Sequence, residues 1–205
     1  MSLAVIGRAT PKKDGADKVT GRTRFLHDLV VPRMAAGKIL RARYPHARLV
    51  RVDTRRAAAL PGVLAVLTAA DVEQKPFGFA KDQTALKAGK VRCIRDEVAA
   101  VAAETAAIAE EALALIDVEY EPLPAVFDPG AALRPGAVRI HEQRADNATD
   151  LRYQFSHGDV DRAFAAATAV VEGEYRLNFV TTACLGTMVA IADWDAQGSL
   201  KKSRT

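Results

Sequence analysis

The chain has 205 residues, of which 49% are hydrophobic and 26% charged, with a net charge of +4 and two cysteines. This length and composition suffice to bury a core in one large domain or two small ones without disulfide bonds. Cys93 and Cys184 lie far apart in sequence, so we expect two reduced, buried thiols and neither a zinc site nor an iron–sulfur cluster. No run reaches the roughly 18 apolar residues of a membrane helix, and no secretory signal is recognisable, so we expect a soluble, cytoplasmic chain without membrane contact.

Charge is distributed unevenly along the sequence. Residues 1–60 carry fourteen Lys or Arg and four acidic residues, whereas residues 93–130 carry one Arg and nine acidic residues. The basic residues are scattered over several elements with little aromatic interleaving, so nucleic acid is not an expected partner. Two alternatives remain: the two regions pair internally, or the basic face meets an acidic partner subunit.

The N-terminal residues predict a surface segment followed by a short strand. Residues 14–22 are polar and turn-rich, which indicates an irregular lead-in that Phe25 and Leu29 anchor. Residues 38–43 alternate as a half-buried strand does, with Ile39 and the stem of Arg43 packed inward.

The next elements follow at short intervals. Residues 49–52 predict a second strand, and Asp53 or Thr54 caps a short helix that runs to Leu60. Pro61-Gly62 ends that helix before a strand at 63–67. Residues 73–89 are expected to be irregular and exposed.

The clearest local pattern is a strand, a helix and a second strand. Residues 98–103 form an apolar run typical of a buried strand, and Thr105 then begins a helix. One helix face is apolar and the other acidic, the apolar residues being Ile108, Ala112, Leu115 and Ile116 and the acidic ones Glu104, Glu110 and Glu111. Val118 and Tyr120 begin the second strand. Pro122 and Pro124 lack an amide donor, so they end this strand and impose an extended exit.

No set of residues predicts catalysis. Asp96 and Glu97, next to Arg92 and Arg95, are interpreted as an exposed ion-pair cluster. Glu110 and Glu111 are adjacent on a helix, so their side chains diverge and cannot act on one atom. Ser156, His157 and Asp159 are better explained as helix capping than as a hydrolase set. The isolated His27, His46, His141 and His157 are expected to be structural or surface residues. We therefore expect no catalytic, cofactor-binding or metal-binding residue.

The C-terminal quarter predicts the beginning of another structural unit. Gly158 or Asp159 starts a helix, with one face formed by Val160, Ala163, Phe164 and Ala167. Residues 169–175 and 188–194 predict strands. The polar tail 201–205 is not expected to pair as a core strand, which would leave the strand at 188–194 partly unpaired.

The order of several short motifs resembles the N-terminal part of the large subunit of molybdenum hydroxylases, the xanthine dehydrogenase and aldehyde oxidase family. The resemblance covers most of residues 7–130. The matching motifs are Asp14-Gly15 with Lys18-Val19-Thr20-Gly21, Pro45-His46-Ala47-Arg48, Leu60-Pro61-Gly62-Val63 with Val66-Leu67-Thr68, and Val118 through Val126.

This resemblance implies an α+β fold, the α/β hammerhead, with small mixed sheets and two or three helices. It places an irregular lead-in at 1–20, the hammerhead domain at 21–130, a connector at 131–150 and a truncated start of the molybdopterin-binding domain at 151–205. In the family, the intact protein is an oxidoreductase acting on aldehyde, heterocyclic or aromatic substrates, with a molybdenum–molybdopterin cofactor. Iron–sulfur and FAD subunits or domains are its expected partners, together with the remaining molybdopterin-binding domains.

The resemblance also implies that this chain is a fragment with a structural, domain-docking role that is not catalytic alone. Two departures from the family pattern are Arg95, where glycine is common, and Gly186, where the family has a glutamate. The polar C-terminal tail is explained by a frame change, a truncated gene or a cloning boundary. The alternative is a free-standing, non-catalytic binding module descended from the family. The sequence names neither the substrate nor the electron acceptor.

Overall fold

The computed structural model describes residues 6–149, 151–178, 180–184, 188–195, 197 and 199–204. The chain divides into two units, which we call the main unit (Met34–Ala166) and the second unit (Met1–Arg33 with Ala167–Thr205). Among the described residues, no helix combines the length and the apolar character needed to cross a bilayer.

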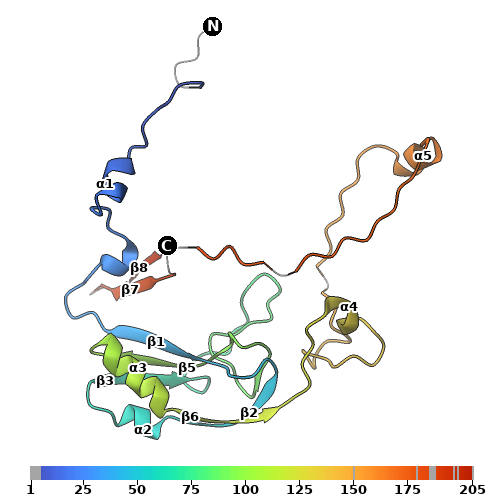
Figure 1. Ribbon diagram of the computed structural model, residues 1–205. Helices are drawn as coiled ribbons and strands as arrows, with labels where there is room; N and C mark the ends of the chain where they lie inside the picture. The colour runs from blue at the N-terminus through green and yellow to red at the C-terminus, as the bar shows by residue number, and fades with distance from the viewer. Residues whose placement is uncertain are drawn as a thin grey trace. The chain divides into compact units, whose positions relative to one another are not determined.

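The main unit contains two antiparallel sheets of three strands each (Figure 1). The first sheet has the order β1-β5-β3 and the second has the order β4-β2-β6. The strands are β1 (Ala36–Arg41), β2 (Ala47–Asp53), β3 (Val63–Thr68), β4 (Lys90–Val91), β5 (Glu97–Ala103) and β6 (Asp117–Pro122). Helix α3 (Ala106–Leu115) packs on β1 and β5, and the short α2 (Arg55–Ala58) packs against α3. The predicted α+β class is confirmed.

The predicted strand-helix-strand unit is present as β5, α3 and β6. Thr105 is the N-cap of α3, and its side chain accepts a hydrogen bond from the backbone of Ile108 at 3.2 Å. The helix buries its small residues Ala109 and Ala112 against β5. The core at this contact consists of Ala57, Ala99, Val101, Ala103, Ala109, Ala112 and Ile116. The small alanine side chains allow close approach of helix and sheet, which is how the Ala-rich sequence determines this layer.

A second cluster lies between the two sheets. It consists of Ala42, Ala47, Val91 and Val98, and Leu40 packs against both this cluster and the one below α3. The two sheets therefore share a continuous apolar interior, in which Val91, Val98 and Val101 are the largest fully buried side chains.

The predicted inward face of the first strand is wrong. Ile39 is 46% exposed, whereas Leu40 packs on the core and Ala42 is buried. In the register of β1 with β5, Leu40 lies opposite Ala99 on the face that α3 covers, so Ile39 points to the other face. Alternation alone gives the period of a strand and not which face is buried, because a shift of one residue exchanges the two faces.

The N-terminal lead-in is exposed, as predicted, but it is not irregular throughout. It contains the short helix α1 (Gly15–Val19), which has no buried residue. The predicted anchors Phe25 and Leu29 are 50% and 39% exposed, and Leu26, in the short 3-10 helix η1 (Leu26–Asp28), is buried instead. The loop at 73–89 is mostly exposed, with Leu86 and Lys87 as its buried exceptions.

The two regions of opposite charge pair within the main unit. Arg51 on β2 lies 2.7 Å from Asp117 and 3.8 Å from Glu119 on β6, and Arg48 lies 3.6 Å from Glu121. Other pairs join β1 to α3 and to β5, namely Lys38 with Glu110 at 2.8 Å and Arg41 with Glu97 at 2.8 Å. This confirms the internal-pairing alternative. Because the basic partners are about half exposed, each pair adds little stability and mainly favours the observed cross-strand register.

Strand β6 ends at the two prolines, as predicted. The backbone N–H of Leu123 donates to the carbonyl of His46, and His46 Nδ1 lies 2.5 Å from the carbonyl oxygen of Pro124. His46 is 2% exposed, so it is a structural histidine that fixes the exit of the chain from β6. The connector continues into the short helix α4 (Pro129–Ala132), whose N-cap is Asp128.

Residues after 150 bury little surface. Helix α5 (Val160–Ala165) begins as predicted, with Asp159 accepting a hydrogen bond from the backbone of Arg162 at 2.9 Å. None of its residues is buried, and Phe164 is 61% exposed. Every described residue from 151 to 184 is exposed. The strand predicted at 169–175 is absent, because a strand needs a hydrogen-bonded neighbour and the described part of the chain places none beside these residues.

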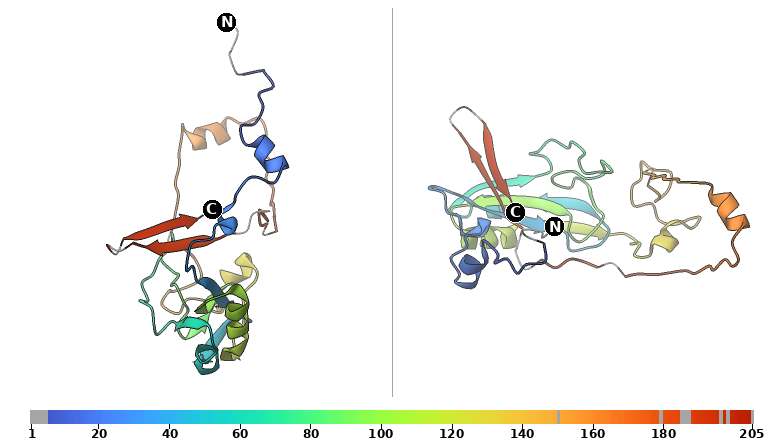
Figure 2. Two further views of the ribbon diagram at one scale, coloured as in Figure 1. Left: turned by 90° about the vertical axis from the view of Figure 1, so that its left-hand side faces the viewer. Right: turned by 90° about the horizontal axis from the view of Figure 1, so that it is seen from above.

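The C-terminal residues form a hairpin (Figure 2). Strand β7 (Ala190–Trp194) pairs antiparallel with β8 (Leu200–Arg204), with Trp194 opposite Leu200. The tail was not expected to pair, and this is wrong, although among the described residues β7 has a neighbouring strand on one edge only. The prediction that Cys184 is buried is also wrong, since this free thiol is exposed and Cys93 is partly buried. Gly186, the second departure from the family pattern, lies outside the described residues.

Candidate functional site

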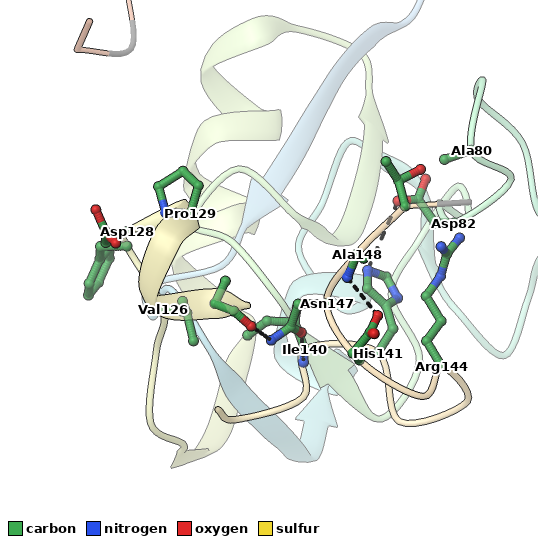
Figure 3. A pocket seen from close by; sticks show the side chains of 14 residues that line it. Ala80, Asp82, Val126, Asp128, Pro129, Ile140, His141, Arg144, Asn147 and Ala148 are labelled. Atoms are coloured by element: carbon green, nitrogen blue, oxygen red, sulfur yellow. Dashed lines mark hydrogen bonds and ion pairs between the residues drawn. The ribbon is translucent and has the colours of Figure 1, made fainter. Parts of the chain in front are cut away.

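The main unit contains a pocket of about 360 Å³ at the far end of the connector (Figure 3). Three segments meet there: the loop that carries Ala80 and Asp82, the exit from β6 at 126–129, and the polar segment 140–149. Apolar walls come from Val126, Pro129 and Ile140, and polar groups come mainly from the third segment. The pocket thus depends on how this last segment is held.

Asn147 holds the segment in place. Its side-chain oxygen accepts from the backbone N–H of Ile140 at 2.9 Å, and its amide donates to the carbonyls of Ala132 at 3.1 Å and Val138 at 2.9 Å. One side chain thereby satisfies three main-chain groups that no helix or strand pairs. Such side-chain to backbone bonding is typical of Asn in irregular segments.

Two of the carboxylates at the pocket also serve the local backbone. Asp128 accepts from the N–H of Ala131 at 2.6 Å as the cap of α4, and Asp146 accepts from the N–H of Ala148 at 2.9 Å. Their charges therefore stabilise turns. Figure 3 shows Asp128 at the opposite end of the pocket from His141 and Arg144.

His141 lies on the wall next to Asp82, with its Nε2 atom 4.0 Å from a carboxylate oxygen. Burial lowers the pKa of His141 below its usual value, and the nearby cations Arg92, Arg144 and Lys90 lower it further, against the opposing effect of Asp82. The imidazole therefore favours the neutral form and lines the wall of the pocket next to Asp82.

An ionic contact ties the same segment to β4. The carboxylate of Glu142 is paired with the buried ammonium of Lys90 and lies 3.4 Å from Arg92, while Arg92 Nε donates to the carbonyl of Ile140 at 3.0 Å. The hydrogen bond from Lys90 is the main reason that the pKa of Glu142 is lowered to about 2. Glu142 stays ionised at physiological pH and keeps the pocket wall against the sheet.

The cluster interpreted as exposed ion pairs has a different structure. Asp96 is 8% exposed and accepts from the backbone N–H groups of Arg92 and Cys93 at 2.6 and 3.3 Å, so it anchors the turn before β5. Glu97 is paired with Arg41 and Lys87. Arg95, where the family has glycine, is not among the residues with positive φ, so the substitution imposes no backbone strain.

The pocket lining contains neither serine nor cysteine, and its histidine faces a carboxylate. Among the described residues, no group of three or more His, Cys, Asp or Glu is placed to hold a metal ion. The arrangement can hold a segment of chain or a small polar molecule by hydrogen bonds. Sequence reasoning missed this pocket, although the run of Asp and Asn at 146–150 was a signal for side-chain bonding to the backbone.

Comparison with known families matches two consecutive domains. The model described as "Aldehyde oxidase and xanthine dehydrogenase, a/b hammerhead domain" matches residues 20–124, and the model described as "Molybdopterin cofactor-binding domain" matches residues 140–202. The first match covers the two sheets with α2 and α3, and the second includes the polar wall of the pocket.

Individual proteins agree with these matches. The chain is 46% identical over 168 residues to a probable xanthine dehydrogenase subunit from Bacillus subtilis (strain 168), covering 81% of this chain and 22% of the relative. It is 34% identical to the nicotine 6-hydroxylase large subunit from Paenarthrobacter nicotinovorans, covering 93% and 24%. The crystal structure of quinoline 2-oxidoreductase from Pseudomonas putida 86 superimposes with a TM-score of 0.79 at 33% identity, covering 95% of this chain and 26% of that one. The chain spans about a quarter of the length of these proteins.

Within the part of 140–202 that the structure describes, the residues do not form a site that fits molybdopterin. A cofactor of that size needs several groups that converge from different elements, whereas every described residue from 151 to 184 is exposed. The pocket at 140–149 is lined by groups that bind their own backbone. No chemical step through the cofactor is derived from this chain.

Proposed function

This chain belongs to the aldehyde oxidase and xanthine dehydrogenase family of molybdenum hydroxylases, and on that premise we propose that it forms the N-terminal, structural part of a large subunit. In this role the hammerhead domain at 21–130 docks on the molybdopterin-binding domains, the connector at 131–150 joins them, and residues 151–205 contribute the first elements of the next domain. The chain has no catalytic activity alone.

One observation carries the proposal: the first part of the chain buries its apolar side chains in a core, and the second part leaves them exposed. The hammerhead region has a closed core between its sheets and α3. The region matched by the cofactor-binding model instead leaves Tyr175, Leu177 and Val180 82–91% exposed. Large apolar side chains at such exposure are unfavourable unless other parts of a protein cover them.

We further propose that the intact protein is a cytoplasmic oxidoreductase. It acts on an aldehyde, heterocyclic or aromatic substrate with molybdenum–molybdopterin, supplied with iron–sulfur and FAD subunits or domains as electron-transfer partners. The names of the relatives, a xanthine dehydrogenase subunit and a nicotine 6-hydroxylase large subunit, support this class of activity. The substrate is left open, since the described residues do not form a substrate site.

Hydrogen exchange on the purified chain, combined with fluorescence of an apolar-surface dye, tests the structural role. We expect amides of residues 151–184 to exchange at the earliest time point, amides of β5 and α3 to be protected, and the dye to fluoresce. A free-standing binding module would instead be monomeric, protected throughout and without dye fluorescence. That result would contradict the proposal and favour the module.

A further inference from the structure

Helix α3 covers one face of the sheet β1-β5-β3. On the opposite face only the end at Val98 is buried, in the cluster between the two sheets. On the rest of this face, cross-strand neighbours share the register Ile39–Ala100–Leu67 in one row and Gly37–Ala102–Ala65 in the next. We call these six residues the open face. Ile39 and Leu67 are 46% and 41% exposed.

The composition of the open face is unlike that of a solvent-facing sheet. An antiparallel sheet with one covered face normally alternates apolar residues inward with polar residues outward. The six positions here contain no polar side chain. The charged residues of β1 lie elsewhere, since Lys38 pairs with Glu110 on the α3 side and Arg41 pairs with Glu97 at the end of the strand.

The open face also has a distinct shape. Within the open face the central strand β5 contributes Ala100 and Ala102, and Ala100 lies between the larger Ile39 on β1 and Leu67 on β3. The next row contains only glycine and alanine. Small residues next to two branched side chains leave space in which one large apolar side chain can make close contacts.

The size of the open face indicates which kind of partner can cover it. A stable complex between separate proteins uses about 20–30 residues on each side, because association costs translational and rotational freedom. Six residues are too few for a second copy of this chain. They suffice for a segment of the same polypeptide, whose effective concentration is set by the covalent connection. The relatives supply such a polypeptide, since about three quarters of their length lies outside the match.

We propose that the open face is the docking surface for an apolar segment from the remainder of the large subunit, with a large apolar side chain seated between Ile39 and Leu67. This inference rests on the proposed function and adds to it the face of the hammerhead domain that makes the contact. The opposite side of the layer, where Glu111 lies exposed on α3, stays in water.

Cysteine accessibility tests the docking surface directly. Ile39→Cys and Leu67→Cys are each made in the chain alone and in a full-length large subunit, in which this chain replaces the matching segment of the Bacillus subtilis relative. Glu111→Cys is the matched control. Maleimide labelling at each position is followed by peptide mass spectrometry, so the native cysteines are resolved separately. We expect labelling at 39 and 67 to be at least tenfold slower in the full-length protein, with labelling at 111 unchanged.

The outcomes separate the two proposals. If the full-length protein retains molybdopterin but positions 39 and 67 react as fast as in the chain alone, the docking surface is wrong and the proposed function stands. If all three positions slow equally, the protection is not specific and the docking surface is again wrong. If the chain with its native residues does not yield a folded, molybdopterin-containing subunit, both proposals fail.

Discussion

Gly62 offers a quantitative test of how α3 is fitted to the first sheet. It precedes β3, has a φ of +85°, and its carbonyl accepts from the N–H of Glu104 at 2.9 Å. A Cβ atom at this position would lie 2.7 Å from Cδ1 of Ile108 on α3. Replacing Gly62 by alanine therefore combines two costs, a left-handed backbone and a steric conflict with the helix.

The two costs can be estimated separately. A left-handed conformation costs an alanine about 1–2 kcal/mol. The steric conflict costs about 1 kcal/mol more, which is the lower end of the range for overpacking, because Cδ1 is the end of a flexible side chain and can move aside. We expect Gly62→Ala to lower the free energy of unfolding by about 2–3 kcal/mol. Ile108→Val deletes Cδ1, costs about 0.5–1.5 kcal/mol alone, and removes the conflict.

Urea unfolding followed by far-UV circular dichroism measures each free energy, and a double-mutant cycle isolates the conflict. Gly62→Ala should cost about 1 kcal/mol less in the Ile108→Val background than in the native one. Gly37→Ala is the control, because Gly37 has an ordinary φ and nothing within 4 Å of its added Cβ. It should raise the free energy of unfolding by about 0.4–1 kcal/mol, the effect of alanine on the unfolded chain alone. Additive costs in the cycle would refute the steric argument, and a Gly62→Ala variant as stable as the native chain would refute both parts.

Three further predictions concern caps and the pocket. Thr105→Ala should destabilise α3 by about 1 kcal/mol in the same urea assay, whereas Thr105→Ser should retain the cap. Asn147→Ala removes three hydrogen bonds at the pocket, so hydrogen exchange at the Ile140 amide should accelerate at least about tenfold, and Asn147→Asp, which keeps this one bond, should accelerate it less. The pKa of Glu142 is lowered from 4.5 to about 2, so its contact with Lys90 contributes stability that is complete above pH 4.5 and is lost as the pH falls toward 2. Exchange rates of residues 138–149 measured over this range should show the loss, and Glu142→Gln should abolish it.

The sequence predicted the centre of the main unit because its signals there are local. The apolar run at 98–103 and the capping residue Thr105 specify a strand and a helix start without reference to the rest of the chain. The paired prolines after Tyr120 likewise end β6 by removing amide donors. Gly62 was recognised as a helix terminator, and its positive φ agrees with that role.

Predictions that depend on distant partners failed. Residues 169–175 have the composition of a strand, but none forms because no neighbouring strand is present for them among the described residues. Ile39 was wrongly assigned to the core. Which residues of β1 face the core is decided by its pairing with β5, which lies about 60 residues later in the chain, so the local sequence does not show it. Asp96 was wrongly predicted to be exposed. Its carboxylate is buried because it accepts from two backbone N–H groups, and these groups come close to it only when the turn has formed.

The error at Ile39 bears on the function of the chain. A sequence that alternates apolar and polar residues on β1 would have indicated one buried face, but Ile39 and Leu40 are both apolar and take opposite faces. The same holds for Val66, which packs on the core, and Leu67, which does not. Strands that are apolar on both faces belong to sheets covered on both sides. The ambiguity in the sequence thus has a physical cause under the proposed docking, in which α3 covers one side of the first sheet and a segment from the remainder of the large subunit would cover the exposed part of the other.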